Sequence, residues 1–311
     1  MRLILHIGTE KTGTTAVQNF LYKNRDVLLR NRIGLLESID YPNNRKLYAY
    51  CLPENEFDDY FWDLNIRDVE AKRQYFKNFQ QEFADEINAF ETQVDTVVIS
   101  SEHFHSRLKD TQSIEKLKSV LEPYFEEINV VCYFREQGAV IKSLYSTSMK
   151  NGHTYTLEAF TNKCLGNEHY FNYNKFLNKW ADVFGKENIK AHIFSRNTLY
   201  KGDVCMDFIR LVDEQLPLHD FDYATEHDNL SLGRVGLYLA RISNRFNPRY
   251  TKNGRRSFRS RLFLKLIEKN PFSYIGKLEF KRGREVRDFY SESNRQFART
   301  YLQMDRDPFS S

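Results

Sequence analysis

The sequence predicts an α/β fold with a central, mostly parallel β-sheet flanked by helices. Two runs of consecutive apolar residues, 96–100 (TVVIS) and 128–134 (INVVCYF), are typical of strands that are buried on both faces. Segments with apolar residues at steps of three and four alternate with these runs, as in amphipathic helices. A further apolar run, residues 3–7, ends at Gly8 and is followed by a helical pattern. A strand, a glycine turn and a helix in this order indicate a nucleotide-binding α/β domain.

The remaining elements follow from the same periodicities. Residues 14–30 carry helical spacing behind the first strand, and residues 66–90 form one long amphipathic pattern. The other expected elements are helices at 113–125, 137–149, 173–184, 204–212 and 230–246, and a strand at 189–194. Asn229 or Ser231 can cap the helix at 230–246, whereas residues 248–287 lack clean periodicity. No boundary is evident, so we expect a single domain over residues 1–311.

The composition describes a globular chain. Its 311 residues are 41% hydrophobic and 15% aromatic, which is enough to bury a core and excludes general disorder. The four cysteines are widely spaced and form no Cys/His cluster suited to zinc, which favours reduced thiols in a cytoplasmic protein. The apolar run at 3–7 is too short for a signal peptide, and no run approaches the ~18 residues of a membrane span. Because the glycine turn begins at Gly8, we also expect no membrane anchor ahead of it.

The net charge of +4 is unevenly distributed along the chain. Residues 249–287 contain 13 Lys or Arg against 3 Glu, a local charge of +10, and the rest of the chain has a charge of −6. This basic segment is open to three interpretations: a solvated basic face, a surface for a polyanion or anionic lipid, or a lid over a cofactor. Nucleic acid is disfavoured, because the rest of the chain is acidic and contains no recognisable nucleic-acid module.

Residues 8–15 (GTEKTGTT) have the five-residue glycine interval of a phosphate-binding loop, in which backbone N–H groups and a helix N-terminus face an anion. The NTPase form of this motif has lysine directly after the second glycine. This chain has Thr14 there and carries its lysine inside the loop, at Lys11. Asp95 precedes its strand, where it is poorly placed to hold Mg²⁺ beside a phosphate. The loop is therefore predicted to bind an anion without a metal, although a strand–glycine–helix junction can also be only a tight turn.

A second polar group follows the strand at 128–134. Arg135 comes directly after this strand, where it faces the ligand crevice of an open α/β sheet, and its guanidinium suits a phosphate. Ser143 lies eight residues further on, where its hydroxyl can add a contact from the next helix. An arginine in this position can equally form a salt bridge at a helix end.

Together, GTEKTGTT (8–15) and CYFREQGAVIKSLYS (132–146) resemble the two nucleotide motifs of the sulfotransferase family that uses 3′-phosphoadenosine 5′-phosphosulfate (PAPS). The motifs agree in order, spacing and structural context. The resemblance extends loosely over residues 1–215, and YSESNRQFARTYL (290–302) is similar to the ending of bacterial carbohydrate-type members. It implies a P-loop-type fold of three layers and an enzyme that requires PAPS but no metal.

The resemblance also implies roles for individual residues. Lys11 would contact the bridging oxygen and the sulfuryl group. The 5′-phosphate would be held by the side chains of Thr14 and Thr15 and by the amides of Thr12 and Gly13. Arg135 and Ser143 would hold the 3′-phosphate, which distinguishes PAPS from other adenine nucleotides.

The acceptor group needs a base, and the candidates follow the strand at 96–100: Ser101, Glu102, His103 and His105. The family places its base just beyond this strand, a histidine in some branches and a glutamate in others, and Glu102 aligns with the glutamate. Partial burial would bring the pKa of Glu102 toward neutrality, whereas that of His103 begins near ~6.5. Alternatively, Ser101 and Glu102 cap a short helix whose solvated face carries both histidines, and neither is the base.

These observations predict a sulfotransferase that moves a sulfuryl group from PAPS to a hydroxyl or amine of a carbohydrate or glycolipid. The acceptor pocket is expected in loops at 40–65 and 150–172. Residues 249–287 fit an anionic polysaccharide or the inner membrane face, to which the protein would be peripheral. The competing functions are a non-catalytic P-loop protein that binds a nucleotide or polyanion, and a P-loop small-molecule kinase.

Overall fold

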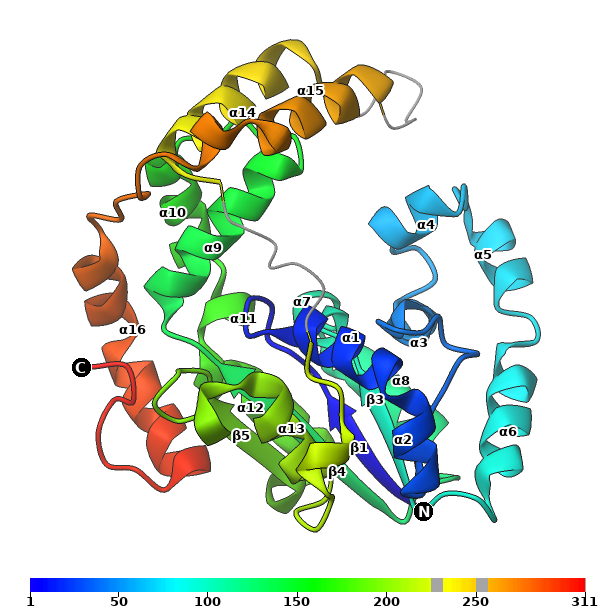
Figure 1. The fold of residues 1–311 in the computed structure, drawn as a ribbon. Helices are drawn as coiled ribbons and strands as arrows, with labels where there is room; N and C mark the ends of the chain where they lie inside the picture. The colour runs from blue at the N-terminus through cyan, green and yellow to red at the C-terminus, as the bar shows by residue number, and fades with distance from the viewer. Residues whose placement is uncertain (225–231, 250–256, 311) are drawn as a thin grey trace. The chain divides into compact units, whose positions relative to one another are not determined.

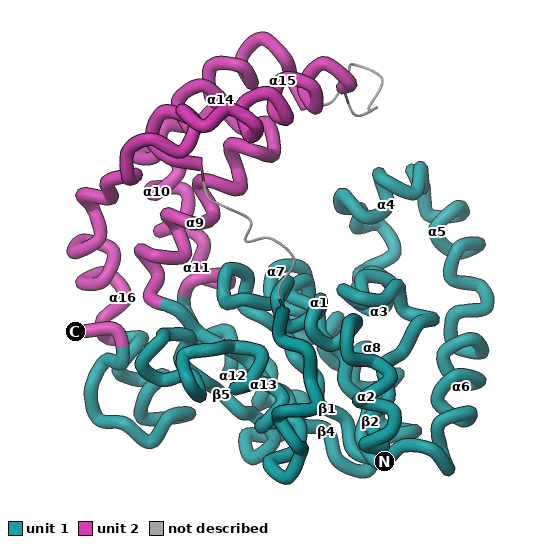
Figure 2. The backbone as a smooth tube through the Cα atoms, viewed as in Figure 1, with its two compact units in different colours: residues 1–135, 172–226, 293–308 teal, residues 136–171, 227–292, 309–311 magenta. Residues whose placement is uncertain are grey.

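The computed structural model describes residues 1–224, 232–249 and 257–310, which form two compact units (Figure 2). Unit 1 comprises residues 1–135, 172–226 and 293–308, and unit 2 comprises residues 136–171, 227–292 and 309–311. The single domain expected over residues 1–311 stays a prediction. The proposed caps Asn229 and Ser231 lie outside the described residues.

Unit 1 is built on a sheet of five parallel strands in the order β2-β3-β1-β4-β5 (Figure 1). The strands are β1 (Arg2–His6), β2 (Ile33–Leu35), β3 (Thr96–Ser100), β4 (Glu127–Phe134) and β5 (Ile189–Ile193). His6 at the end of β1 is in register with Ser100 at the end of β3. The chain leaves β1 toward β2 and β3 on one side and returns to β4 and β5 on the other. In open α/β sheets, the carboxyl end of a strand at such a switch in strand order is where ligands bind.

Helices cover both faces of this sheet. On one face, α1 (Thr14–Lys23) and α13 (Val204–Val212) pack against Ile4, Val98 and Val131 in one hydrophobic cluster. The other face carries α12 (Tyr173–Phe184), which packs against α8 (Thr111–Leu121) and places the ring of Phe176 6.4 Å from that of Phe134 on β4. The three layers and the parallel sheet confirm the predicted fold class.

Unit 1 contains six further α-helices, three 3₁₀ turns and a π-helical turn among its described residues. The α-helices are α2 (Arg25–Arg30), α3 (Arg45–Cys51), α4 (Asp59–Asp63), α5 (Val69–Tyr75), α6 (Phe79–Phe90) and α7 (His103–Arg107). The 3₁₀ turns are η1 (Lys186–Asn188), η2 (Tyr200–Gly202) and η3 (Leu218–Asp220), and the π-helical turn is η5 (Ala298–Leu302). The segment 40–65, expected to be a loop, therefore contains α3 and α4.

Two helices that the sequence predicts as continuous are interrupted. Asn24 separates α1 from α2, because its side-chain amide donates to the Phe20 carbonyl while its side-chain oxygen accepts from the Asp222 amide. The pattern over residues 66–90 is divided between α5 and α6. Phe76 lies in the break and packs edge-on against Phe79, with 5.8 Å between ring centroids. Apolar spacing runs through this break because both segments face the same aromatic cluster.

Unit 2 is helical in its described part. Its helices are α9 (Gln137–Lys150), α10 (Leu157–Leu165), α11 (Glu168–Phe171), α14 (Arg234–Phe246), α15 (Phe258–Lys269) and α16 (Gly283–Phe297), with the 3₁₀ turn η4 (Pro271–Tyr274). Residues 293–297 of α16 belong to unit 1. The expected loop at 150–172 thus contains α10 and α11, and the segment 248–287, which lacks clean periodicity in the sequence, contains α15. No residue of α15 is fully buried, and Ile267 packs only partly buried against the cluster that contains Leu237, so the periodicity shows no strong core-facing stripe.

Cys51, Cys132, Cys164 and Cys205 are buried, with free thiols. Within the three described stretches, each helix is too short or too polar to cross a membrane.

Candidate functional site

The glycine loop predicted from residues 8–15 follows β1 and is fixed to the neighbouring strand β4. The Thr9 amide donates to the Tyr133 carbonyl over 3.1 Å, and the Tyr133 amide donates to the Gly8 carbonyl over 2.9 Å. Gly8 has a φ of 103°, in the left-handed region that favours glycine. A Cβ at Gly8 would lie 3.1 Å from the Cα of Glu102, so the loop and Glu102 are in close contact.

The loop presents its backbone amides at the start of α1. The hydroxyls of Thr12 and Thr14 both donate to the Thr9 carbonyl, over 2.6 and 3.2 Å, and this folds the loop back on itself. The amide N–H groups of residues 12–16 have no acceptor among the described residues. Unbonded amides at the positive end of a helix dipole are the features by which helix N-termini bind anions. The side chain of Thr15 is exposed on the first turn of α1.

The structure brings Lys11 and Arg135 together. Arg135 directly follows β4, as the sequence predicts, and its Nη1 donates to the Lys11 carbonyl over 3.2 Å. The Arg135 guanidinium lies 5.7 Å from the ring centroid of Phe194. The backbone carbonyl of Arg135 accepts a hydrogen bond from the Tyr173 hydroxyl over 2.6 Å. Arg135 thereby supports the loop from the end of the adjacent strand.

Glu102 follows β3 and is mostly buried beside the loop. Nε2 of Gln18 on α1 donates to its Oε2 over 2.8 Å and also to the Ser100 carbonyl over 3.1 Å. Burial raises the pKa of Glu102, and the hydrogen bond from Gln18 and the charge of Lys11 act in the opposite direction. The carboxylate is therefore held in one orientation with a pKa above the ordinary value for glutamate.

Sequence reasoning missed Gln18. The residue is 4% exposed and lies among the buried side chains of α1, between Val17 and Phe20. A polar residue on the apolar side of a helix, one turn after Thr14, is the signal that could have identified it. Its two hydrogen bonds link the helix that follows the loop to the segment that follows β3.

The two histidines after β3 occupy different environments. His103 stacks on Tyr48 with ring centroids 4.9 Å apart, and its buried Nδ1 has no hydrogen-bond partner among the described residues. Burial and the charges of Arg45 and Arg107 lower the pKa of His103 to about 3. His105 is fully buried.

The alternative that places both histidines on a solvated helix face is therefore wrong. The same alternative has Ser101 and Glu102 cap this helix with their side chains, and at Glu102 the structure shows no such cap. Glu102 occupies the N-cap position of α7, but its side chain makes no capping hydrogen bond there. Ser101 is fully buried, with a hydroxyl that has no partner in the described part of the chain.

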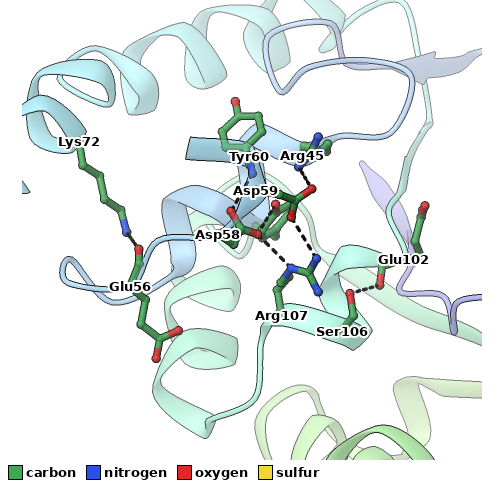
Figure 3. Close-up of polar contacts among 10 residues, drawn as sticks. Arg45, Glu56, Asp58, Asp59, Tyr60, Lys72, Glu102, Ser106 and Arg107 are labelled. Atoms are coloured by element: carbon green, nitrogen blue, oxygen red, sulfur yellow. Dashed lines mark hydrogen bonds and ion pairs between the residues drawn. The ribbon is translucent and has the colours of Figure 1, made fainter. Parts of the chain in front are cut away.

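A cluster of ion pairs holds α7 against α3 and α4 (Figure 3). Nε of Arg107 lies 3.0 Å from Oδ2 of Asp58, and Nη2 of Arg107 lies 3.1 Å from Oδ1 of Asp59. Arg45 completes the cluster through Oδ2 of Asp59, at 3.1 Å, and the Tyr48 hydroxyl donates to Asp58 over 2.8 Å. This cluster fixes the helix that begins at His103, and no sequence motif marks it.

Ser143 lies on α9 and belongs to unit 2, whereas Arg135 ends the first segment of unit 1. Ser143 is half-buried, and its carbonyl accepts from the Thr147 hydroxyl over 3.4 Å. The joint role of Arg135 and Ser143 at a 3′-phosphate stays a prediction.

In the described part of the chain, the candidate residues belong neither to a metal-binding group nor to the hollow that lies beside β2. Among the described residues, no group of three or more His, Cys, Asp or Glu side chains is arranged to hold a metal ion. The hollow beside β2 is lined by Leu29, Gly34, Tyr41 and Phe90, among others, and contains none of the candidate residues.

No protein-family model matches the chain. An uncharacterized protein of Archaeoglobus fulgidus is 29% identical over 119 residues, which are 38% of this chain and 31% of that protein, so the match spans about a third of the relative's length. The crystal structure of a sulfotransferase from Alicyclobacillus acidocaldarius aligns with 88% of this chain and 98% of its own, at 13% identity and a TM-score of 0.41.

Proposed function

We propose that this protein transfers a sulfuryl group from PAPS to a hydroxyl or amine of a carbohydrate or glycolipid acceptor. The observation that carries the proposal is the contact between an anion-binding loop and an oriented carboxylate of raised pKa. The unbonded amides of residues 12–16 lie in the loop that begins at Gly8 and in the first turn of α1, and a Cβ at Gly8 would be 3.1 Å from the Cα of Glu102. Donor binding and proton removal thus have candidate groups in one place.

The donor half of the reaction is assigned to the loop. PAPS supplies a sulfuryl group joined to its 5′-phosphate through a bridging oxygen, and 3′,5′-adenosine bisphosphate is the leaving group. The amides of Thr12 and Gly13, with those at the start of α1, hold the 5′-phosphate. Lys11 neutralises the charge that develops on the bridging oxygen as the sulfur–oxygen bond breaks. A sulfuryl group carries less negative charge than a phosphoryl group, so a lysine can act where kinases use Mg²⁺.

The acceptor half is assigned to Glu102. Its carboxylate accepts the proton of the acceptor hydroxyl or amine while the acceptor atom bonds to sulfur. Burial raises the pKa of Glu102, which makes its carboxylate a stronger base. His103, with a pKa of about 3, is a weak proton acceptor at neutral pH, and this favours Glu102 over His103.

Gln18 is proposed as a positioning residue that acts through Glu102. We expect Gln18→Leu to raise the pKa of Glu102, because a hydrogen bond that stabilises the carboxylate is lost. Since the base must be ionised, the acid limb of the profile of kcat/KM against pH should move to higher pH. Asn19→Leu, an exposed position on the same helix, is the control and should leave the limb in place. An unchanged limb in Gln18→Leu would remove Gln18 from this role.

Arg135 is proposed to recognise the 3′-phosphate, and its variant must separate that role from support of the loop. We expect the parent to bind 3′,5′-adenosine bisphosphate more tightly than adenosine 5′-phosphate. Arg135→Ala should lose about tenfold or more of this discrimination, the usual effect of removing a charge-assisted hydrogen bond. Calorimetry with both ligands measures it, and Arg30→Ala, an exposed residue on α2, serves as the control. An equal loss for both ligands would mean that Arg135 only supports Lys11.

Ligand choice tests the proposed function against its competitors. Binding of 3′,5′-adenosine bisphosphate without metal, followed by transfer of labelled sulfate from PAPS to carbohydrate acceptors, is the expected result. Preference for ATP with Mg²⁺ would indicate a small-molecule kinase. Binding of the bisphosphate with no transfer to any carbohydrate or glycolipid tested would favour a non-catalytic nucleotide-binding protein.

A further inference from the structure

The helices α14 and α15 of unit 2 form a hairpin closed by η4 (Figure 1). The Gly233 amide donates to the Ser273 carbonyl and the Arg234 amide to the Gly276 carbonyl, each over 2.8 Å. Nδ2 of Asn244 on α14 donates to the Met149 carbonyl at the end of α9, also over 2.8 Å. Backbone hydrogen bonds therefore close the hairpin at the start of α14, and a side-chain hydrogen bond near the end of α14 joins it to α9.

One face of α15 consists of exposed apolar side chains. The helix buries none of its twelve residues, and Phe258 is 70% and Leu266 56% exposed. At about 100° per residue, four exposed apolar side chains fall within one side of the helix. These residues, Phe258, Leu262, Phe263 and Leu266, are called the α15 apolar face below.

Basic side chains accompany this face. Arg259, Arg261, Lys265 and Lys269 lie on α15, against a single acidic residue, Glu268. Glu268 pairs with Lys150 on α9 at 3.0 Å, so its charge is compensated within the unit. In the part of the chain that the structure describes, no carboxylate lies within ion-pair distance of those four basic residues. Arg261 and Lys265 fall along one border of the α15 apolar face on a helical wheel, and Arg259 and Lys269 fall within it.

We propose that α15 docks on the surface of an anionic phospholipid bilayer, with its axis along the interface. The apolar side chains would enter the boundary between headgroups and acyl chains, and the Arg and Lys side chains would reach the lipid phosphates. An anionic polysaccharide would use the charges but leave four large apolar side chains in water. A second copy of the same face would bring its four cations against four others. A bilayer of anionic lipid accommodates both the exposed apolar side chains and the basic side chains of α15.

Co-sedimentation with vesicles tests the proposal without donor or acceptor, so its result is independent of the proposed enzymatic function. We expect the protein to bind phosphatidylcholine vesicles with 30% phosphatidylglycerol about tenfold or more tightly than pure phosphatidylcholine, and more weakly as salt rises. Leu262→Ser with Leu266→Ser should lower binding about tenfold, and Arg261→Glu with Lys265→Glu should lower it to the level of neutral vesicles. Arg284→Glu with Phe289→Ser, two exposed positions on α16, forms the matched control and should bind as the parent does.

A fluorescence measurement distinguishes insertion from attraction by charge alone. Phe263→Trp should be quenched by brominated lipids in anionic vesicles, whereas Phe289→Trp should not. Equal vesicle binding by the parent and the Leu262/Leu266 variant, or no binding of anionic vesicles by the parent, would overturn the proposal. Binding of dextran sulfate with no binding of vesicles would likewise overturn it and identify a polysaccharide surface. Far-UV circular dichroism establishes that each variant is folded.

Discussion

Replacement of Glu102 by glutamine should lower kcat by about two orders of magnitude or more while the fold is retained. The substitution preserves shape, and the amide oxygen of glutamine can still accept the hydrogen bond that Nε2 of Gln18 donates to Oε2. The variant loses only the ability to take up the acceptor's proton. Affinity for 3′,5′-adenosine bisphosphate should change little, because Glu102 is assigned to the acceptor and the loop amides to the donor.

Two further variants make this result interpretable. Glu91→Gln, an exposed carboxylate just after α6, should have the kcat of the parent. His103→Gln tests the competing base, and we expect it to lower kcat less than Glu102→Gln does, since burial lowers the pKa of His103 and leaves it a weak proton acceptor. Rates are measured by transfer of labelled sulfate at saturating donor. Near-normal turnover of Glu102→Gln would exclude this residue as the base, and a larger loss in His103→Gln would transfer the role to the histidine.

The parts of the fold that the sequence predicts correctly are those in which local pattern and tertiary burial agree. The strand β3 and the helices α12 and α13 have the predicted bounds, because their apolar residues both set the periodicity and face the core. The strand β2 escapes prediction, since it has three residues with Gly34 at its centre and is defined by its pairing with β3. A pairing between distant segments leaves no local signal of this kind.

The candidate site likewise contains residues that the sequence identifies and contacts that it does not. Lys11, Glu102 and Arg135 could be selected from the sequence because each follows a predicted strand, and the ends of parallel strands meet at one edge of the sheet. The hydrogen bond from Gln18 to Glu102 could not be predicted, because it depends on how α1 is oriented above the sheet. The burial of His103 likewise comes from stacking on Tyr48, more than fifty residues earlier in the chain. Sequence therefore locates the groups, and packing decides which of them can act as a base.

Replacement of Lys11 should affect both kcat and, slightly, the affinity for the bisphosphate product, whereas replacement of Glu102 should affect kcat alone. We expect Lys11→Ala to lower kcat by about two orders of magnitude or more, because charge on the leaving oxygen is greatest in the transition state. The bisphosphate product lacks the sulfuryl group, so its affinity should fall only a few-fold. The contact of Arg135 also survives, since it is made to the backbone carbonyl of Lys11.

Backbone conformation provides a second variant at this position. Lys11 has a φ of 69°, in the left-handed region that asparagine adopts more readily than alanine. Lys11→Asn should therefore keep the loop conformation and lose activity as Lys11→Ala does, which would assign the loss to the missing ammonium group. Lys77→Ala, an exposed position between α5 and α6, should behave as the parent. If Lys11→Asn turned over within about fivefold of the parent, the ammonium group of Lys11 would be excluded from stabilising the transition state, and the role of the loop would be limited to holding the donor.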